Sequence, residues 1–463
     1  MRRTKYNSFV GLSAVLTLAF ATGCPDREVA QVNPKPTKEE YKDIPVELNR
    51  DIDILFVVDN SGSMEEEQTS LNANFQNFIN VLEGIQGGLP NVHIGVVSTD
   101  VGAGPFNISG CTGSGDNGTM QSVARGPSCT APSGAFISDV EDPANPGSRI
   151  TNYNGTLADT FACIAELGTS GCGFEQPLES MRRALNGSNP TNSGFLRENA
   201  FLAVIIISDE DDCSTRNTDM FDTSQDSPTA PLGPLSSFRC FEFGVKCDPD
   251  DPRTPGPRQN CESREDSQYM FTVQEYVDFL KGLKDDPNNV IVAGIIGNPT
   301  PVTVGANDQG NPELQPSCVS NSGEAAPAVR TKQFLDQFPQ RSTVTTICNE
   351  DLSDALIIIA QLLAKVIGNP CLQGNVDTDP DTPGVQYECQ VSDVRFPGEE
   401  NQTETIIPEC SAVPPSSGDL PCWHLETDTD NCADTATQLS LVIERGTGSV
   451  PSGTHVIARC VVE

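Results

Sequence analysis

The sequence Ile52-Asp53-Ile54-Leu55-Phe56-Val57-Val58 runs directly into Asp59-Asn60-Ser61-Gly62-Ser63. Its first seven residues form an almost continuous apolar run of strand length, which is typical of a parallel strand buried on both faces. Gly62 allows a tight turn, and residues 65–85 then have the pattern of a helix. The stretch therefore predicts a buried strand, a polar loop at its carboxyl end, and a helix.

The same alternation continues along the chain. Similar apolar runs lie at residues 92–97, 201–207 and 290–296, and helix-like stretches at 174–185, 273–283 and 352–367. Residues 135–140 are expected to add a short edge strand. Alternating buried strands and helices predict a doubly wound α/β domain, with a mainly parallel sheet, helices on both faces, and functional loops at the carboxyl ends of the strands.

Three insertions, near residues 101–160, 213–268 and 298–325, are rich in Gly, Pro, Asn, Ser and Cys. We expect them to fold as loops held by disulfides rather than by a core of their own. Of the 17 cysteines, ten lie between Cys111 and Cys348 and six between Cys371 and Cys460. These even counts favour an α/β domain over residues 48–370 and a separate, small Cys-rich β module over 371–463, although sequence does not give the disulfide connectivity.

The beginning of the chain has the pattern of an export signal. Three basic residues precede an apolar stretch at 9–21, which is shorter than the roughly 20 residues that span a bilayer. The following Ala21-Thr22-Gly23-Cys24 resembles a bacterial lipoprotein signal, which implies lipidation of Cys24 and a protein anchored in the cell envelope, at the outer membrane or cell surface rather than the inner membrane. Residues 25–47, rich in Pro and charged residues, are expected to be a flexible tether. The alternative is an ordinary signal peptide followed by a disulfide cysteine.

The formal net charge of −36 excludes several functions. Nucleic acids and anionic membrane surfaces are bound through clustered Lys and Arg, so neither is an expected partner. Only three His occur, without a Cys-x-x-Cys pair, which argues against zinc. No nucleophile, metalloprotease or phosphate-loop motif is present, so we do not expect an enzyme. The acidity fits a solvated surface, divalent-cation binding by a few carboxylates, or both.

Polar residues follow two of the predicted strands. Asp59, Ser61 and Ser63 follow the first, and Asp209 follows the strand at 201–207. Parallel strands bring such ends to one edge of the sheet, and one carboxylate with two hydroxyls is a suitable partial shell for Mg²⁺. Thr169, in the loop before the helix at 174–185, offers another hydroxyl. The alternatives are a plain turn with Asp59 capping the helix, a helix-start role for Thr169, and Thr156 or Thr160 in its place.

These residues resemble the von Willebrand factor A, or integrin inserted-domain, family over residues 50–368. Asp59, Ser61 and Ser63 match its first motif, Thr169 its second-loop threonine and Asp209 its third-loop aspartate. The resemblance implies a metal-ion-dependent adhesion site, in which the serines bind Mg²⁺ or Ca²⁺ directly, the threonine joins them in the high-affinity state, and the aspartates act mainly through water. A carboxylate from a protein partner would complete the shell.

The chain departs from that pattern at Glu210, Asp211 and Asp212, where the family often has glycine. These residues are candidates for a second ion or a shift toward Ca²⁺, and the alternative is a solvated acidic loop. The insertion at 101–160 is expected to overhang the site. Asp377, Asp379, Asp381 and Glu388 have the spacing of a calcium loop, but Thr382 replaces its glycine, which favours a plain acidic turn.

Metal-bridged protein binding is thus the expected function. The alternatives are a structural envelope protein that binds partners without metal and a metal-assisted hydrolase that uses the acidic residues around Asp209.

Overall fold

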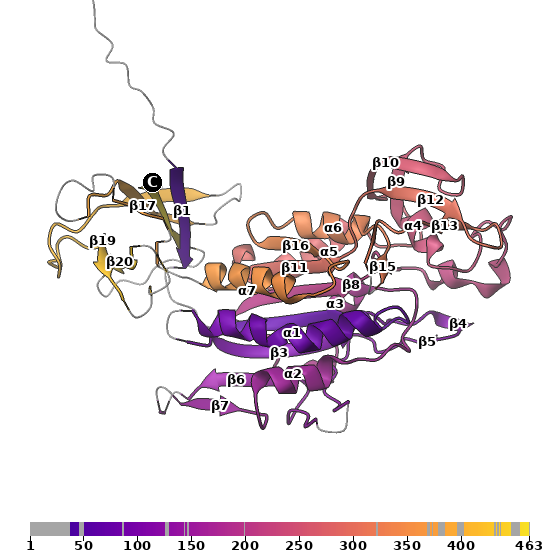
Figure 1. The fold of residues 1–463 in the computed structure, drawn as a ribbon, viewed down its shortest axis with the longest axis horizontal. Coiled ribbons are helices and arrows are strands. Elements are labelled where there is room, and N and C mark those ends of the chain that lie inside the picture. Colours follow the sequence, from indigo (N-terminus) through magenta and orange to yellow (C-terminus); the bar gives the residue numbers. More distant parts are fainter. Residues whose placement is uncertain are drawn as a thin grey trace, which may run out of the picture. The chain divides into compact units, whose positions relative to one another are not determined.

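The computed structural model describes residues 38–45 and 51–462, apart from 86–87, 126–128, 143, 146–147, 199, 321–322, 368–370, 373, 378–384, 396–401, 430–431, 433–434, 436 and 446–453 (Figure 1). Cys24 and two carboxylates of the calcium-loop spacing, Asp379 and Asp381, lie outside these residues. Among the described residues, no helix is both long and apolar enough to cross a membrane.

A seven-stranded sheet forms the centre of the α/β domain. In spatial order its strands are β16 (Ser342–Thr346), β11 (Val290–Ile296), β8 (Phe201–Ser208), β2 (Asp51–Val58), β3 (Asn91–Ser98), β6 (Ile137–Glu141) and β7 (Arg149–Thr151). The five strands from β16 to β3 are parallel, and β6 and β7 are antiparallel. The predicted α/β class is confirmed. A strand does form close to residues 135–140, but β7 pairs with its outer side and is the edge strand.

Helices cover both faces of this sheet, because side chains alternate along each strand. On β2, Ile54 and Phe56 face one cluster and Leu55 and Val57 the other, all fully buried. The first face is covered by α1 (Glu65–Glu83), α2 (Leu157–Ala165) and α7 (Ser353–Ile367), and α1 and α7 lie side by side in Figure 1. The second is covered by α3 (Pro177–Leu185), α5 (Val273–Lys281) and α6 (Val329–Asp336).

The second and third insertions were expected to be loops, and this expectation is wrong. Strands from both insertions pair into a four-stranded sheet, in the order β13 (Pro312–Leu314), β12 (Val302–Ala306), β10 (Gly256–Ser263) and β9 (Val245–Asp248). With α4 (Phe238–Gly244), this sheet encloses a small apolar cluster that includes Phe241 and Val304. Each insertion alone has too few strands for a core, but the two together have enough.

Shorter elements complete the insertions. They are the hairpin β4 (Gly104–Ile108) and β5 (Cys111–Gly113), the pair β14 (Cys318–Val319) and β15 (Glu324–Ala325), and the 3₁₀ helices η1 (Pro190–Asn192), η2 (Thr218–Phe221), η3 (Thr223–Gln225) and η4 (Pro287–Asn289). The buried Arg239 side chain donates to the carbonyl oxygens of Met220 at 2.6 Å and Gly233 at 2.8 Å. Hydrogen bonds from a guanidinium group, and not apolar contacts alone, therefore hold these turns together.

The C-terminal module is a β structure. Its strands are β17 (Cys389–Arg395), β18 (Thr403–Ile407), β19 (Cys422–Thr427), β20 (Leu439–Glu444) and β21 (Thr454–Val462). A four-stranded sheet has the order β1-β21-β17-β18, in which β1 is Lys38–Pro45, and β19 pairs with β20. Residues 38–45, expected within the tether, therefore form an edge strand of this sheet.

Eight disulfides join the described cysteines. Five pairs lie between Cys111 and Cys348 and three between Cys371 and Cys460, as the even counts predicted. The pairs are 111–172, 129–163, 213–240, 247–261, 318–348, 371–432, 389–460 and 410–422. None of these bonds links the two sets of cysteines.

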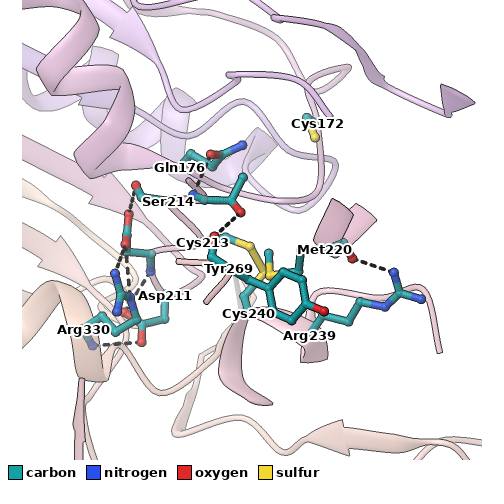
Figure 2. Close-up of a disulfide and its surroundings, with 12 residues drawn as sticks. Cys172, Gln176, Asp211, Cys213, Ser214, Met220, Arg239, Cys240, Tyr269 and Arg330 are labelled. Atoms are coloured by element: carbon teal, nitrogen blue, oxygen red, sulfur yellow. Dashed lines mark hydrogen bonds and ion pairs between the residues drawn. A yellow bond between two sulfur atoms is a disulfide. The ribbon is translucent and has the colours of Figure 1, made fainter. Parts of the chain in front are cut away.

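A buried ion pair anchors the loop that follows β8. Arg330 and Asp212 are both fully buried, and the Arg330 Nη2 atom lies 3.0 Å from the Asp212 carboxylate. Arg330 also donates to the Gly244 carbonyl at 3.2 Å and the Ser263 hydroxyl at 2.9 Å, which connects α6 to the second insertion. Figure 2 shows this arginine beside Asp211 and near the Cys213–Cys240 disulfide.

Replacing this arginine tests the anchor. Arg330→Met is expected to lower the free energy of unfolding by about 3–5 kcal/mol, because it leaves a buried carboxylate without its cation. The matched control is Lys332→Met, whose side chain is partly exposed on the same helix and pairs with Asp336 only at the surface, so its effect should stay within about 0.5 kcal/mol. Denaturant titration followed by circular dichroism measures both, and equal stability of the two variants would refute the anchor.

Candidate metal centre

The candidate site lies where the direction of strand addition reverses. The chain passes from β2 to β3 on one side, and β8 then pairs with the other side of β2. Val58 is in register with Ile207, and the Asp59 amide donates to the Ile207 carbonyl at 2.9 Å. The acidic residues after these two strands, Asp59 and Asp209, therefore emerge side by side, at the position where α/β sheets usually bind ligands.

The first loop presents two converging hydroxyls above a fixed carboxylate. Asp59 is fully buried, and its two oxygens accept hydrogen bonds from the Ser61 amide at 2.8 Å and the Ser208 hydroxyl at 2.6 Å. The hydroxyl oxygens of Ser61 and Ser63 lie 3.2 Å apart. The two serine hydroxyls thus lie next to each other, and their role as metal ligands stays a prediction.

The second loop packs directly against the first. The buried Gln68 side chain on α1 donates to the carbonyls of Asp59 at 2.8 Å and Gly168 at 2.9 Å, and it accepts from the Gly168 amide. The Gly171 amide donates to the Asn60 carbonyl at 2.8 Å. A side chain at Gly171 would overlap with the Asn60 side chain and force it to move, so glycine suits this close approach. Thr169 lies between these two attachment points, and its role as a ligand stays a prediction.

The rival threonines have other roles. The Thr156 hydroxyl caps α2 by accepting from the Asp159 amide at 3.0 Å, and the Thr160 hydroxyl donates to the Thr156 carbonyl at 2.9 Å. Both side chains therefore serve the local structure of α2.

The third loop, which follows β8, contains four acidic residues at positions 209–212, and only two of them interact with α6. Asp211 accepts from the backbone amides of Val329, Arg330 and Thr331 at the start of α6, and Asp212 pairs with Arg330. The suggestion that Asp211 and Asp212 are extra metal ligands is therefore corrected, because their oxygens are engaged by α6. Asp209 and Glu210 remain at the sheet edge.

Two further carboxylates, which sequence reasoning missed, complete the surroundings. Glu175 is fully buried, close enough to Asp59 for their carboxyl groups to hydrogen-bond, and it also accepts from the Thr99 hydroxyl. Glu67 on α1 is 7% exposed and acts electrostatically on both Asp59 and Asp209. Pro177 could have revealed Glu175, since proline favours the first helical position and so leaves Glu175 in the loop.

Five carboxyl groups are crowded at this sheet edge, and all of them have raised pKa values. They belong to Asp59, Glu67, Glu175, Asp209 and Glu210. Burial is the largest cause of a raised pKa in every one of them, and it raises the pKa of Asp209 to about 7. Repulsion from Asp59 adds to the effect at the other four. No basic side chain is among the principal groups that set these pKa values. The cluster therefore needs protons or a cation to offset its charge.

Several buried oxygens in this region have no hydrogen-bond partner among the described residues. Four buried atoms around Asp59 lack a hydrogen-bond partner among the described residues. They are Asn60 Oδ1, Glu67 Oε2, Glu175 Oε1 and Asp209 Oδ1. Buried acceptors are rarely left unpaired, and the binding of an ion is one accepted reason. Within the described residues, no three His, Cys, Asp or Glu side chains are placed to hold an ion by themselves.

A cavity of about 260 Å³ opens beside this centre. Its lining includes Ser63 and Asp209 together with residues of the second and third insertions, such as Phe238, Phe241 and Leu314. The first insertion is joined to the second loop by the Cys111–Cys172 disulfide, and its expected overhang of the site stays a prediction.

His93, the histidine of the α/β domain, lies away from the candidate site. It contacts the Phe195 carbonyl and Asp53 near the beginning of β2, whereas Asp59 follows the end of this strand. His93 is therefore not placed to act as a base at Ser61 or Ser63. The hydrolase alternative stays a hypothesis.

The chain was compared with known protein families, sequences and structures. No protein-family model matches the chain, and neither does any curated protein sequence. Among solved structures, the pilus adhesin SpaC from Lactobacillus rhamnosus GG in an open conformation matches at 12% identity and a TM-score of 0.31, covering 92% of this chain and 41% of its own. A von Willebrand factor type A protein from Catenulispora acidiphila matches at 10% identity and a TM-score of 0.26, covering 92% of this chain and 66% of its own. The pilus adhesin RrgA from Streptococcus pneumoniae matches at 10% identity and a TM-score of 0.26, covering 94% of this chain and 60% of its own.

The chain thus spans less than two thirds of each of these proteins. Similarity at this level assigns no function to the chain, so its function has to be inferred from the residues of the site.

Proposed function

We propose that this protein binds a protein partner through a divalent cation, Mg²⁺ or Ca²⁺, held at the carboxyl ends of β2 and β8. Ser61 and Ser63 would bind the ion directly, Asp59 and Asp209 would act mainly through water, and Thr169 would join them. The bound ion would supply an open position for a carboxylate of the partner. The supporting observation is the pair of hydroxyls 3.2 Å apart beside buried carboxylate oxygens that lack a partner among the described residues.

Titration calorimetry on chelator-treated full-length protein tests cation binding. The wild type should take up one Mg²⁺ or Ca²⁺ at this site, and Ser61→Ala/Ser63→Ala should weaken uptake by at least about tenfold, since even supporting residues of metal sites contribute that much. Thr69→Ala is the matched control, because this exposed hydroxyl on α1 donates to the Glu65 carbonyl of the same helix. Unchanged uptake in the double serine variant would contradict the proposal.

Cation binding should depend on pH. The pKa of Asp209 is about 7, so its carboxyl group is half protonated near neutrality and becomes more protonated as pH falls. A cation must displace that proton, and its apparent affinity should therefore fall between pH 8 and pH 6, approaching tenfold per pH unit for each proton displaced. Calorimetry in buffers of different ionisation enthalpy counts the released protons. Affinity that stays constant over this range would show that Asp209 does not take part.

Partner capture separates the proposal from its structural alternative. Wild-type protein used as bait should retain its partner in Mg²⁺ and lose it in chelator, and the double serine variant should behave in Mg²⁺ like wild type in chelator. Capture that persists undiminished in chelator would support metal-independent packing instead.

The cell-envelope location is a separate part of the proposal and rests on the sequence around Cys24. Cys24→Ala should move the protein from the membrane fraction to the soluble fraction of a bacterial host, because a lipid chain supplies its membrane affinity. Fractionation with immunodetection measures this shift. Membrane association that survives the substitution would remove the lipid anchor from the account.

A further inference from the structure

The Cys410–Cys422 disulfide of the C-terminal module has one accessible and one inaccessible end. Cys422, the first residue of β19, is fully buried, whereas Cys410, between β18 and β19, is half-buried. A thiolate opens a disulfide by attacking the sulfur that it can reach. An incoming thiol would therefore meet Cys410 and release Cys422.

A histidine lies directly beside this bond. Side chains alternate along β19, so Cys422, His424 and Glu426 share one face of the strand. The Nδ1 atom of His424 lies 3.9 Å from the Cys410 sulfur. Its other ring nitrogen, Nε2, lies 3.9 Å from a carboxylate oxygen of Glu426, which favours the protonated ring. An imidazole between a sulfur and a carboxylate is suited to accept and return a proton.

The backbone around the bond is also held by other interactions. The Cys410 amide donates to the Trp423 carbonyl at 2.8 Å, and the Trp423 amide donates to the Pro408 carbonyl at 3.0 Å. The two cysteines are 12 residues apart, compared with 61 and 71 for the other two described disulfides of the module. A short cross-linked loop adds less stability than a long one. The bond can therefore open at a small cost in stability, with both sulfurs still close enough to close it again.

From these observations we propose that Cys410–Cys422 is a thiol–disulfide exchange site for a cysteine thiol from outside the protein. The incoming sulfur attacks Cys410, the bond to Cys422 breaks, and a new disulfide joins the incoming sulfur to Cys410. His424 takes the proton of the incoming thiol and returns it to the departing Cys422 sulfur. The incoming thiol is oxidised and Cys422 is reduced, so the step needs no other reactant.

The chain contains a matched control, the Cys247–Cys261 disulfide. Its cysteines are 14 residues apart, and it likewise joins a buried residue, Cys247, to a half-buried one, Cys261. The Cys261 sulfur lies 3.9 Å from the Gln259 carbonyl oxygen, and not beside an imidazole nitrogen. A comparison of the two bonds in one molecule therefore isolates the effect of His424.

Reduced glutathione, added to the folded full-length protein, tests the site. Quenching by alkylation and mass spectrometry of the peptides give the opening rate of each disulfide. Cys410–Cys422 should open at least about tenfold faster than Cys247–Cys261, a modest share of what a positioned acid or base usually contributes. Glutathione should be found on Cys410. A capped peptide with one cysteine is the second probe, and the faster of the two probes shows whether a protein thiol or a small thiol is preferred.

Two variants decide the role of the histidine. His424→Gln should reduce the ratio of the two rates to near one, and Glu426→Gln, at an exposed side chain, should lower it in part. An unchanged rate at Cys247–Cys261 shows that each variant is folded, and if His424→Gln raises that rate, Glu426→Gln alone decides. Equal rates in the wild type, glutathione on Cys422, or a ratio that is unchanged in the folded variants would overturn the proposal.

Discussion

The parallel pairing of β2 with β8 is the constraint on which the site depends. Because Val58 and Ile207 are in register, Asp59 and Asp209 must emerge next to each other at the sheet edge. Buried like charges repel strongly in a medium of low polarity, and no arginine or lysine is among the principal groups that set their pKa values. The fold therefore creates a negative centre beside two serine hydroxyls, and the proposed cation would offset its charge. Apolar residues at these positions would avoid this cost.

The insertions use different physical means from the sheet. The sheet is held by apolar side chains on both faces, whereas the second insertion relies on the buried cations Arg239 and Arg330 and on disulfides. Such polar anchors have strict geometry, so they fix the walls of a cavity more sharply than a few apolar contacts could. The sheet thus positions the site residues, and the insertions determine the shape and charge of the cavity beside them.

Sequence reasoning recovered the parts of the molecule that depend on local pattern. The buried strands were predicted to within about a residue, and the rule that parallel strands end at one sheet edge was enough to place Asp59 beside Asp209. It missed β16, whose Ser- and Thr-rich sequence is half-buried and carries no strong apolar signal, and the sheet shared by two insertions, since pairing at long range leaves no local trace. It also misjudged Asp211 and Asp212, because their partner Arg330 is more than a hundred residues away in sequence.

The central claim is that a divalent cation is held between the hydroxyls of Ser61 and Ser63. Anomalous diffraction from crystals of the full chain grown with Mn²⁺, a substitute for Mg²⁺ that scatters anomalously, tests it most directly. We predict one strong peak beside both serine oxygens, with Asp59 and Asp209 nearby and at least one ligand position open toward the cavity. No peak there at saturating Mn²⁺, or a peak bound by other residues while these hydroxyls remain free, would contradict the claim.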